Sequence, residues 1–188
     1  MIMVNKVKQE LFSTPIWTHN LENTEKLNQD LIKEAGKYKF GEDYFSIKSD
    51  AIQELKSRIL PIIKEVVDEC GFSSENMHIT GRQNPKFPGE CDSPHHHPEC
   101  MLSILYYVSI PPKSGDLLLH DPRGPVTWKD PEARTDVSWK SYRMFHRITP
   151  KEGSLLFFPS YLIHSVETNL SNEMRLSIAI TPHNIYEI

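Results

Sequence analysis

The apolar positions in the first third of the chain recur at helical spacing. Between Asn23 and Lys39 they alternate with Glu, Lys and Gln at the period of an amphipathic helix, which we expect to end near Gly41. A second apolar stripe at residues 52–67 predicts another helix, with Gly71 as its C-terminal stop. Pro61 is expected to kink this helix or divide it into two shorter ones, because proline lacks the backbone donor and clashes with the preceding turn.

From residue 76 onward the apolar period changes to two, which is the period of a strand. Short alternating runs bounded by Pro, Gly and Asn predict strands at 77–81, 101–110, 116–120, 143–148, 153–158, 164–168 and 175–181. Such strands indicate an all-β sandwich or barrel, with the two helices packed outside it. We expect one domain over 1–188, with a helical flank at 1–75 and a β core at 76–188. The irregular stretch 121–142 is expected to be a lid or substrate loop.

Composition excludes several classes of partner. The 188 residues include 21 Lys plus Arg and 25 Asp plus Glu, interspersed without a basic block, so we expect no nucleic-acid partner. No apolar run approaches the length of a membrane span, and the first ten residues lack the apolar centre of a signal peptide, so we expect no membrane partner and a cytoplasmic location. The 3 cysteines have no CxxC spacing and are expected to be free thiols.

Three adjacent histidines, among 9 in the chain, indicate a metal site. On an extended segment His95, His97 and Glu99 share one face, while His96 points away from it. Two histidines and a carboxylate on one face are typical of a mononuclear iron site with open positions for a chelating cosubstrate and dioxygen. His164 follows a buried-strand signal and is the best further ligand.

Arg175 and Ser177 share a face of a predicted strand 11 residues after His164. A dicarboxylate cosubstrate needs a cation for its remote carboxylate, and the planar guanidinium binds a carboxylate through two hydrogen bonds. The alternative is a surface arginine that pairs with Glu173.

The order of these motifs resembles that of the Fe(II)/2-oxoglutarate-dependent oxygenases, and more narrowly a family of such oxygenases common in phages and marine bacteria. The matching segments are 11–16, 95–98, 102–108, 121–123, 153–160, 164–166 and 175–178. The resemblance implies a mainly β fold, the double-stranded β-helix or jelly roll. It implies Fe(II) as cofactor and 2-oxoglutarate as cosubstrate, with Arg175 and Ser177 on the C5 carboxylate. Tyr107 matches a tyrosine that contacts this carboxylate, and Asn84 a cosubstrate or substrate contact.

The metal ligands have two competing registers. The resemblance favours His95, His97 and His164, with no acid among them. A literal His-x-Glu reading gives His97, Glu99 and His164 instead, and water or Asp121 in the third position is a further alternative.

The resemblance implies oxidation of a C–H bond, usually hydroxylation, coupled to decarboxylation of 2-oxoglutarate to succinate. The substrate would be a small molecule or a peptide side chain, with dioxygen as the oxidant. Two other functions remain open at this point, namely a cupin-like metal dioxygenase or isomerase without 2-oxoglutarate, and a non-catalytic β-barrel binding protein. The oligomeric state is also open, with a homodimer among the alternatives.

Overall fold

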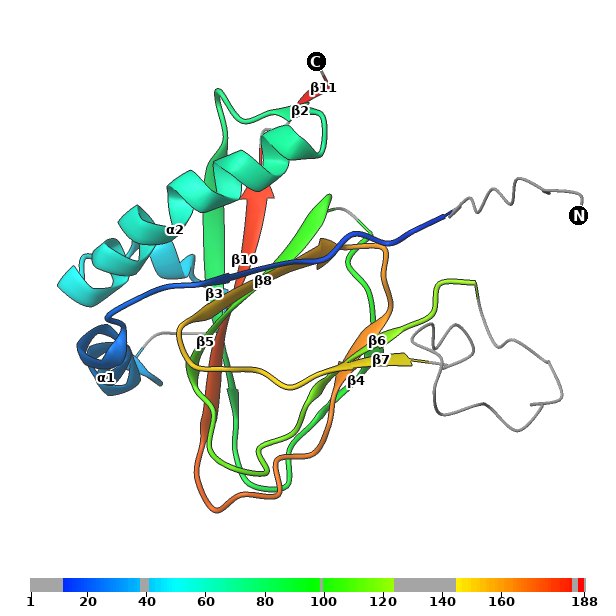
Figure 1. Ribbon diagram of the computed structural model, residues 1–188. Helices are drawn as coiled ribbons and strands as arrows, with labels where there is room; N and C mark the ends of the chain where they lie inside the picture. Colours follow the sequence, from blue (N-terminus) through cyan, green and yellow to red (C-terminus); the bar gives the residue numbers. More distant parts are fainter. Residues whose placement is uncertain (1–11, 38–40, 99, 124–144, 184–185, 188) are drawn as a thin grey trace, which may run out of the picture.

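The computed structural model describes residues 12–37, 41–98, 100–123, 145–183 and 186–187 (Figure 1). Its helices are α1 Glu25–Glu34, the short 3-10 helix η1 Tyr44–Ser46 and α2 Asp50–Glu69. Its strands are β1 Trp17–Asn20, β2 Phe72–Ser73, β3 His78–Lys86, β4 Asp92–His95, β5 Leu102–Ser109, β6 Leu117–His120, β7 Phe145–Ile148, β8 Ser154–Pro159, β9 His164–Val166, β10 Arg175–His183 and β11 Tyr186–Glu187.

Two antiparallel sheets face each other and form a double-stranded β-helix. The major sheet has the strand order β1-β8-β5-β10-β3, and the minor sheet has the order β4-β9-β6-β7. From β3 to β10 the chain passes back and forth between the two sheets, so residues distant in sequence meet on facing strands. The predicted mainly β architecture is therefore confirmed.

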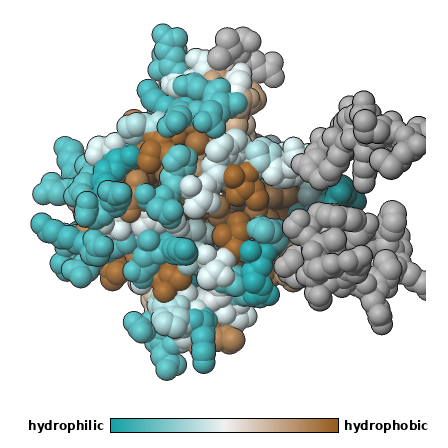
Figure 2. All heavy atoms as spheres, viewed as in Figure 1, coloured by the Kyte–Doolittle hydropathy of each residue, from teal (hydrophilic) through white to brown (hydrophobic). Residues whose placement is uncertain are grey.

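The helices cover the outer face of the major sheet, as Figure 1 shows. Leu27 and Leu31 of α1 and the apolar stripe of α2 pack against outward-facing residues of β5 and β10, such as Ile104 and Ile178. Tyr106 adds a polar tie, because its buried hydroxyl donates to Asn28 Oδ1 of α1 at 2.7 Å. Figure 2 shows the hydrophilic side chains gathered over the helices, which is the polar half of the amphipathic pattern.

A second, smaller core fills the space between the sheets. Tyr107, Leu156 and Phe158 from the major sheet pack with Leu117 and Val166 from the minor sheet. Side chains alternate across a strand. Every second residue of β5, β8 and β10 therefore faces the helices, and the residues between them point into this interior. The interior face of the major sheet is therefore where functional side chains can meet the minor sheet.

The structure corrects the two predicted helices. α1 ends at Glu34, earlier than the predicted end near Gly41, and Ile32, one of the apolar residues between Asn23 and Lys39, is 39% exposed. α2 runs unbroken through Pro61, so the expectation of two shorter helices was wrong. Pro61 lies on the exposed side of α2, where water can hydrate the carbonyl that loses its partner.

The sequence also missed β1, a four-residue edge strand that pairs with β8. The proposed loop at 121–142 lies outside the described residues from 124 onward. The described residues contain no helix of the length and hydropathy that a membrane span requires. All three cysteines are free, as predicted.

Candidate metal centre

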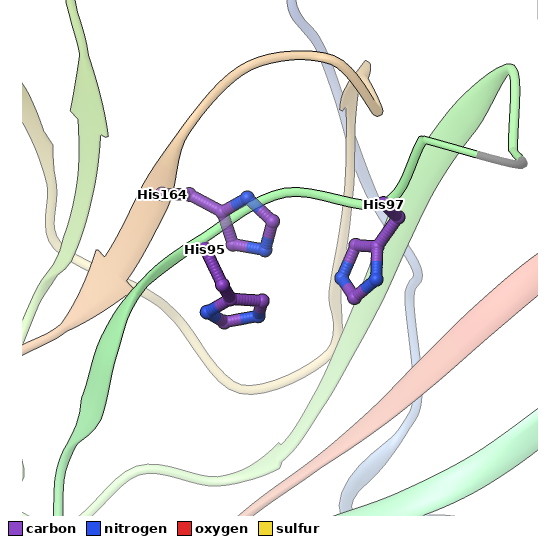
Figure 3. A group of neighbouring side chains, drawn as sticks. All are labelled: His95, His97 and His164. Atoms are coloured by element: carbon purple, nitrogen blue, oxygen red, sulfur yellow. The ribbon is translucent and has the colours of Figure 1, made fainter.

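Three histidine side chains converge on the interior of the β-helix (Figure 3). His95, at the end of β4, pairs directly across the minor sheet with His164, at the start of β9. Their ring centroids are 4.3 Å apart, and the His97 ring lies 5.1 and 5.2 Å from them. One ligand nitrogen from each ring lies within 4.8 Å of the other two. This is a spacing that a single metal ion can draw together into one coordination sphere.

Backbone carbonyls orient two of these rings. His164 Nδ1 lies 2.9 Å from the carbonyl oxygen of Leu162, and His95 Nδ1 lies 2.8 Å from that of Ser93. A carbonyl only accepts hydrogen bonds, so both Nδ1 atoms carry the proton and both Nε2 atoms keep a free lone pair. A hydrogen bond of this kind holds a metal-binding histidine in the correct tautomer.

The backbone holds His97 in place, since its N–H donates to the Ser160 carbonyl at 3.0 Å. His97 follows β4 by two residues and projects toward the same centre, as its sequence spacing predicted, whereas His96 is exposed.

Burial keeps the imidazoles of His97 and His164 neutral. The pKa of His164 is lowered to about 4, mainly by desolvation; the hydrogen bond to the Leu162 carbonyl opposes this effect, and the neighbouring His95 and His97 add to it. The pKa of His97 is also lowered, first by burial and then by His95 and Arg82. Neutral imidazole is the form that binds a metal, so at neutral pH both rings are ready ligands.

Arg175 is a buried cation at the start of β10, with 2% of its surface exposed. Its Nη1 donates to the Gly115 carbonyl at 3.1 Å, and its guanidinium lies 5.8 Å from the centre of the Tyr107 ring. Among the described residues no carboxylate lies within ion-pair distance of it. Burial lowers its pKa, while Tyr107 and the more distant Asp92 and Asp116 oppose this effect. The alternative of a surface arginine paired with Glu173 was wrong.

The other predicted cosubstrate residues lie beside Arg175. Ser177 points to the same side of β10 and is paired in register with Asn84 of β3 and Tyr107 of β5. The Tyr107 hydroxyl is buried without a hydrogen bond of normal geometry, and burial raises its pKa strongly although the Arg175 charge opposes this. Arg175, Ser177, Tyr107 and Asn84 therefore form one polar group on the interior face of the major sheet.

A cavity of about 730 Å³ opens beside the three histidines. His95, His97 and His164 line it on one side, with Asn84 among the residues opposite. Its wall does not include Arg175, Ser177 or Tyr107, which lie deeper in the molecule.

Two neighbouring features were not found from the sequence. Lys86 Nζ lies 3.0 Å from Asp92 Oδ1 and donates to Asn84 Oδ1 at 2.7 Å, and Lys86 is paired in register with Arg175. Arg82, two residues before Asn84, lines the cavity. The alternation of β3 could have suggested Arg82, but the partner of Lys86 depends on the folded position of β4.

Two acidic residues, Asp121 and Glu99, were considered as alternative metal ligands. Asp121 does not join the histidine cluster, because its carboxylate pairs with Arg123, whose hydrogen bonds lower the pKa of Asp121. The prediction of Asp121 as a ligand is therefore not supported. Glu99, on which the second register depends, lies outside the described residues.

A double-stranded β-helix with three histidine nitrogens converging in its interior defines a class of mononuclear metal proteins. Residues 84–181, just over half of the chain, match the family described as "Putative 2OG-Fe(II) oxygenase". The chain belongs to this family and is a 2-oxoglutarate- and Fe(II)-dependent oxygenase. The matched span contains every site residue predicted from the sequence, and the family decides in favour of the oxygenase over the two other functions that the sequence left open.

Solved structures with the same fold have low sequence identity to this chain. A Pseudomonas putida prolyl-4-hydroxylase is 15% identical, with a TM-score of 0.61, and the match covers 95% of this chain and 90% of that one. The epimerase SnoN, in complex with Fe3+, alpha ketoglutarate and nogalamycin RO, is 15% identical, with a TM-score of 0.62 and coverages of 92% and 81%. HygX from Streptomyces hygroscopicus, with nickel and 2-oxoglutarate bound, is 12% identical, with a TM-score of 0.59 and coverages of 90% and 81%. No curated protein matches the sequence.

Proposed function

We propose that His95, His97 and His164 hold the Fe(II) of this oxygenase, each through one ring nitrogen. The proposal rests on the convergence of the three rings, two of them from the paired residues His95 of β4 and His164 of β9, and the third from His97 just after β4. The backbone hydrogen bonds to His95 and His164 leave the Nε2 atoms free to bind, and burial keeps His164 unprotonated at neutral pH. The donor set, three neutral nitrogens, fits a divalent first-row metal.

Arg175, Ser177, Tyr107 and Asn84 are the proposed partners of 2-oxoglutarate. A guanidinium that is buried without an acid is costly unless an anion joins it, and the C5 carboxylate supplies that anion. The unpaired Tyr107 hydroxyl and the Ser177 hydroxyl on the same face add donors to this carboxylate. Asn84 links this group to the cavity that the histidines line, because it is itself in the cavity wall and is paired in register with Ser177.

Charge explains why a site without an acidic ligand can still work. Three neutral imidazoles leave the full charge of Fe(II) uncompensated, so the metal-binding carboxylate of the cosubstrate would offset part of it, while the C5 carboxylate pairs with Arg175. With iron and 2-oxoglutarate bound, the centre supplies the oxidising chemistry, in which dioxygen converts 2-oxoglutarate to succinate and carbon dioxide and oxidises a C–H bond. The reaction we propose is hydroxylation of a small molecule or a peptide side chain.

Single substitutions separate the proposed ligand set from its alternative. His95→Ala, His97→Ala and His164→Ala are each expected to abolish stoichiometric Fe(II) binding in anaerobic calorimetry, whereas His96→Ala keeps it because His96 is exposed. Glu99→Gln distinguishes the registers. If Glu99→Gln loses iron and His95→Ala keeps it, the ligand set is the alternative His97, Glu99 and His164.

The cosubstrate proposal has its own readout. Succinate formed from 2-oxoglutarate is expected to require both Fe(II) and Arg175. An Arg175→Gln protein that binds iron normally and turns over 2-oxoglutarate at the wild-type rate would contradict it.

A further inference from the structure

Arg82 is a cation in the cavity wall that neither the metal site nor the cosubstrate group uses. Its neighbours on β3, Ile79 and Gly81, face the helices, since a Cβ on Gly81 would lie 2.7 Å from the Phe45 ring. By the alternation of a strand, Arg82 projects from the opposite face, toward the three histidines. Two residues along a strand span about 6.6 Å, so Arg82 lies one row beyond Asn84.

The strand register shows what lies around this cation. Arg82 is paired with Ala179 of β10, and Ala179 is paired with Leu105 of β5. A methyl group beside Arg82 leaves room for a ligand. The next row is polar, with Thr80 Oγ1 2.8 Å from His183 Nε2.

Two aspartates in the cavity wall, Asp43 and Asp92, have partners other than Arg82. Asp43 Oδ1 accepts from the backbone N–H groups of Gly81 and Phe45 at 2.8 and 3.1 Å, and Asp92 pairs with Lys86. Glu42 also lines the cavity and has an interaction of its own.

Among the residues that the structure describes, Arg82 has no ion pair and no hydrogen bond from its side chain. Its guanidinium is therefore available to a ligand in the cavity. Apolar residues also line the cavity: Leu105 and Phe158 come from β5 and β8 of the same sheet as Arg82, and Leu117 comes from the minor sheet.

We infer that the primary substrate carries an anionic group, a carboxylate or a phosphate, which Arg82 binds while the carbon to be oxidised lies against the apolar wall beside the histidines. The oxidation of this substrate rests on the proposed function, whereas the binding of its anionic group to Arg82 does not. The planar guanidinium recognises either anion through paired hydrogen bonds. Arg82 is thus assigned as a residue that selects the substrate, separate from the cosubstrate anchor Arg175.

Anion binding to the full-length protein tests the inference without knowledge of the natural substrate. The probes are N-acetylglycine, its uncharged analogue N-acetylglycinamide, and inorganic phosphate, each titrated in the presence of saturating 2-oxoglutarate. The ¹⁵N resonance of Arg82 Nε reports binding in metal-free protein, and the visible band of the Fe(II)–2-oxoglutarate complex reports approach to the metal. Arg82→Gln removes the charge, and Arg82→Lys keeps the charge without the planar fork.

The expected result is saturable binding of N-acetylglycine or phosphate at millimolar concentration, at least about tenfold weaker in Arg82→Gln and intermediate in Arg82→Lys. The amide gives no saturable response, and the relative affinities of the two anions distinguish a carboxylate from a phosphate substrate. Arg147→Gln is the control, because Arg147 is exposed and already paired with Asp116 and Glu167.

Equal binding by wild type and Arg82→Gln, equal binding of the amide, or no saturable anion binding overturns the inference. Absence of the visible band, with anion binding still dependent on Arg82, overturns the proposed function instead and leaves the inference standing.

Discussion

Replacement of Arg175 by methionine separates two effects of this buried cation, one on the stability of the ligand-free protein and one on the affinity for 2-oxoglutarate. The side chain is 2% exposed, and no described carboxylate lies within ion-pair distance. Its recorded side-chain hydrogen bond goes to the Gly115 carbonyl at 3.1 Å. The ligand-free protein therefore carries a desolvated charge, which in our proposal the C5 carboxylate of 2-oxoglutarate neutralises.

The structure gives the size of both effects. Two charge-assisted hydrogen bonds to a carboxylate are worth about 3–6 kcal/mol together, so Arg175→Met is expected to weaken 2-oxoglutarate binding by about 10²–10⁴-fold. The same change removes the desolvated charge but loses the hydrogen bond to Gly115, so the free energy of unfolding of the metal-free protein should stay unchanged or rise by up to about 2 kcal/mol.

Calorimetry with Fe(II) under anaerobic conditions measures the affinity, and urea unfolding of the metal-free protein measures the stability. Arg147→Met is the matched control, because its exposed guanidinium is paired with Asp116 and Glu167 and lies outside the proposed site, so 2-oxoglutarate affinity should not change. An Arg175→Met protein that keeps its 2-oxoglutarate affinity within about threefold, or that is strongly destabilised, would refute this reasoning.

Three further predictions concern stability. The folded-state pKa of His164 is about 4, against 6.5 for an ordinary histidine, so as the pH falls the unfolded chain takes up this proton first. In urea unfolding, the free energy of unfolding of the metal-free protein should fall by about 3 kcal/mol between about pH 6.5 and pH 4, and by clearly less in His164→Gln. The same pH dependence in both proteins would contradict this. Gly115→Ala places a Cβ 2.3 Å from the Glu167 carbonyl oxygen at a φ of +90°, and we expect at least about 2 kcal/mol lower stability together with weaker 2-oxoglutarate binding; normal stability would show that the loop adapts. Pro61→Ala restores a donor within α2 and should raise the stability by about 1–3 kcal/mol, whereas a lower Tm would mean that Pro61 has a packing role.

The periodicity of apolar residues was sufficient to predict the helices and strands that bury one face. The apolar stripe of α2 and the buried run of β8 were predicted within a few residues of their observed bounds. β1 was missed because it is short and its exposure alternates along an edge of the sheet. Pro61 was misjudged because the effect of a proline depends on whether it faces solvent, which is a property of the packed helix.

The candidate site was predicted to a similar extent. The spacing of His95 and His97 follows from an extended chain, but the burial of Arg175 depends on Gly115, 60 residues earlier, and on the facing sheet. Arg82 was not considered because the strand alternation that puts it on the same face as Asn84 does not distinguish an exposed arginine beside a cavity from any other exposed arginine. The cytoplasmic location, the single-domain organisation and the oligomeric state stay predictions.

The central claim is that the three histidines hold Fe(II) and that Arg175 anchors 2-oxoglutarate beside it. An anaerobic titration that follows the weak visible band of the Fe(II)–2-oxoglutarate chelate tests both parts together. We predict that the band appears with one equivalent of Fe(II), requires 2-oxoglutarate, is absent in His164→Ala and needs far more 2-oxoglutarate in Arg175→Met. A wild-type protein that binds no stoichiometric Fe(II), or a band that is the same in His164→Ala, would contradict the account.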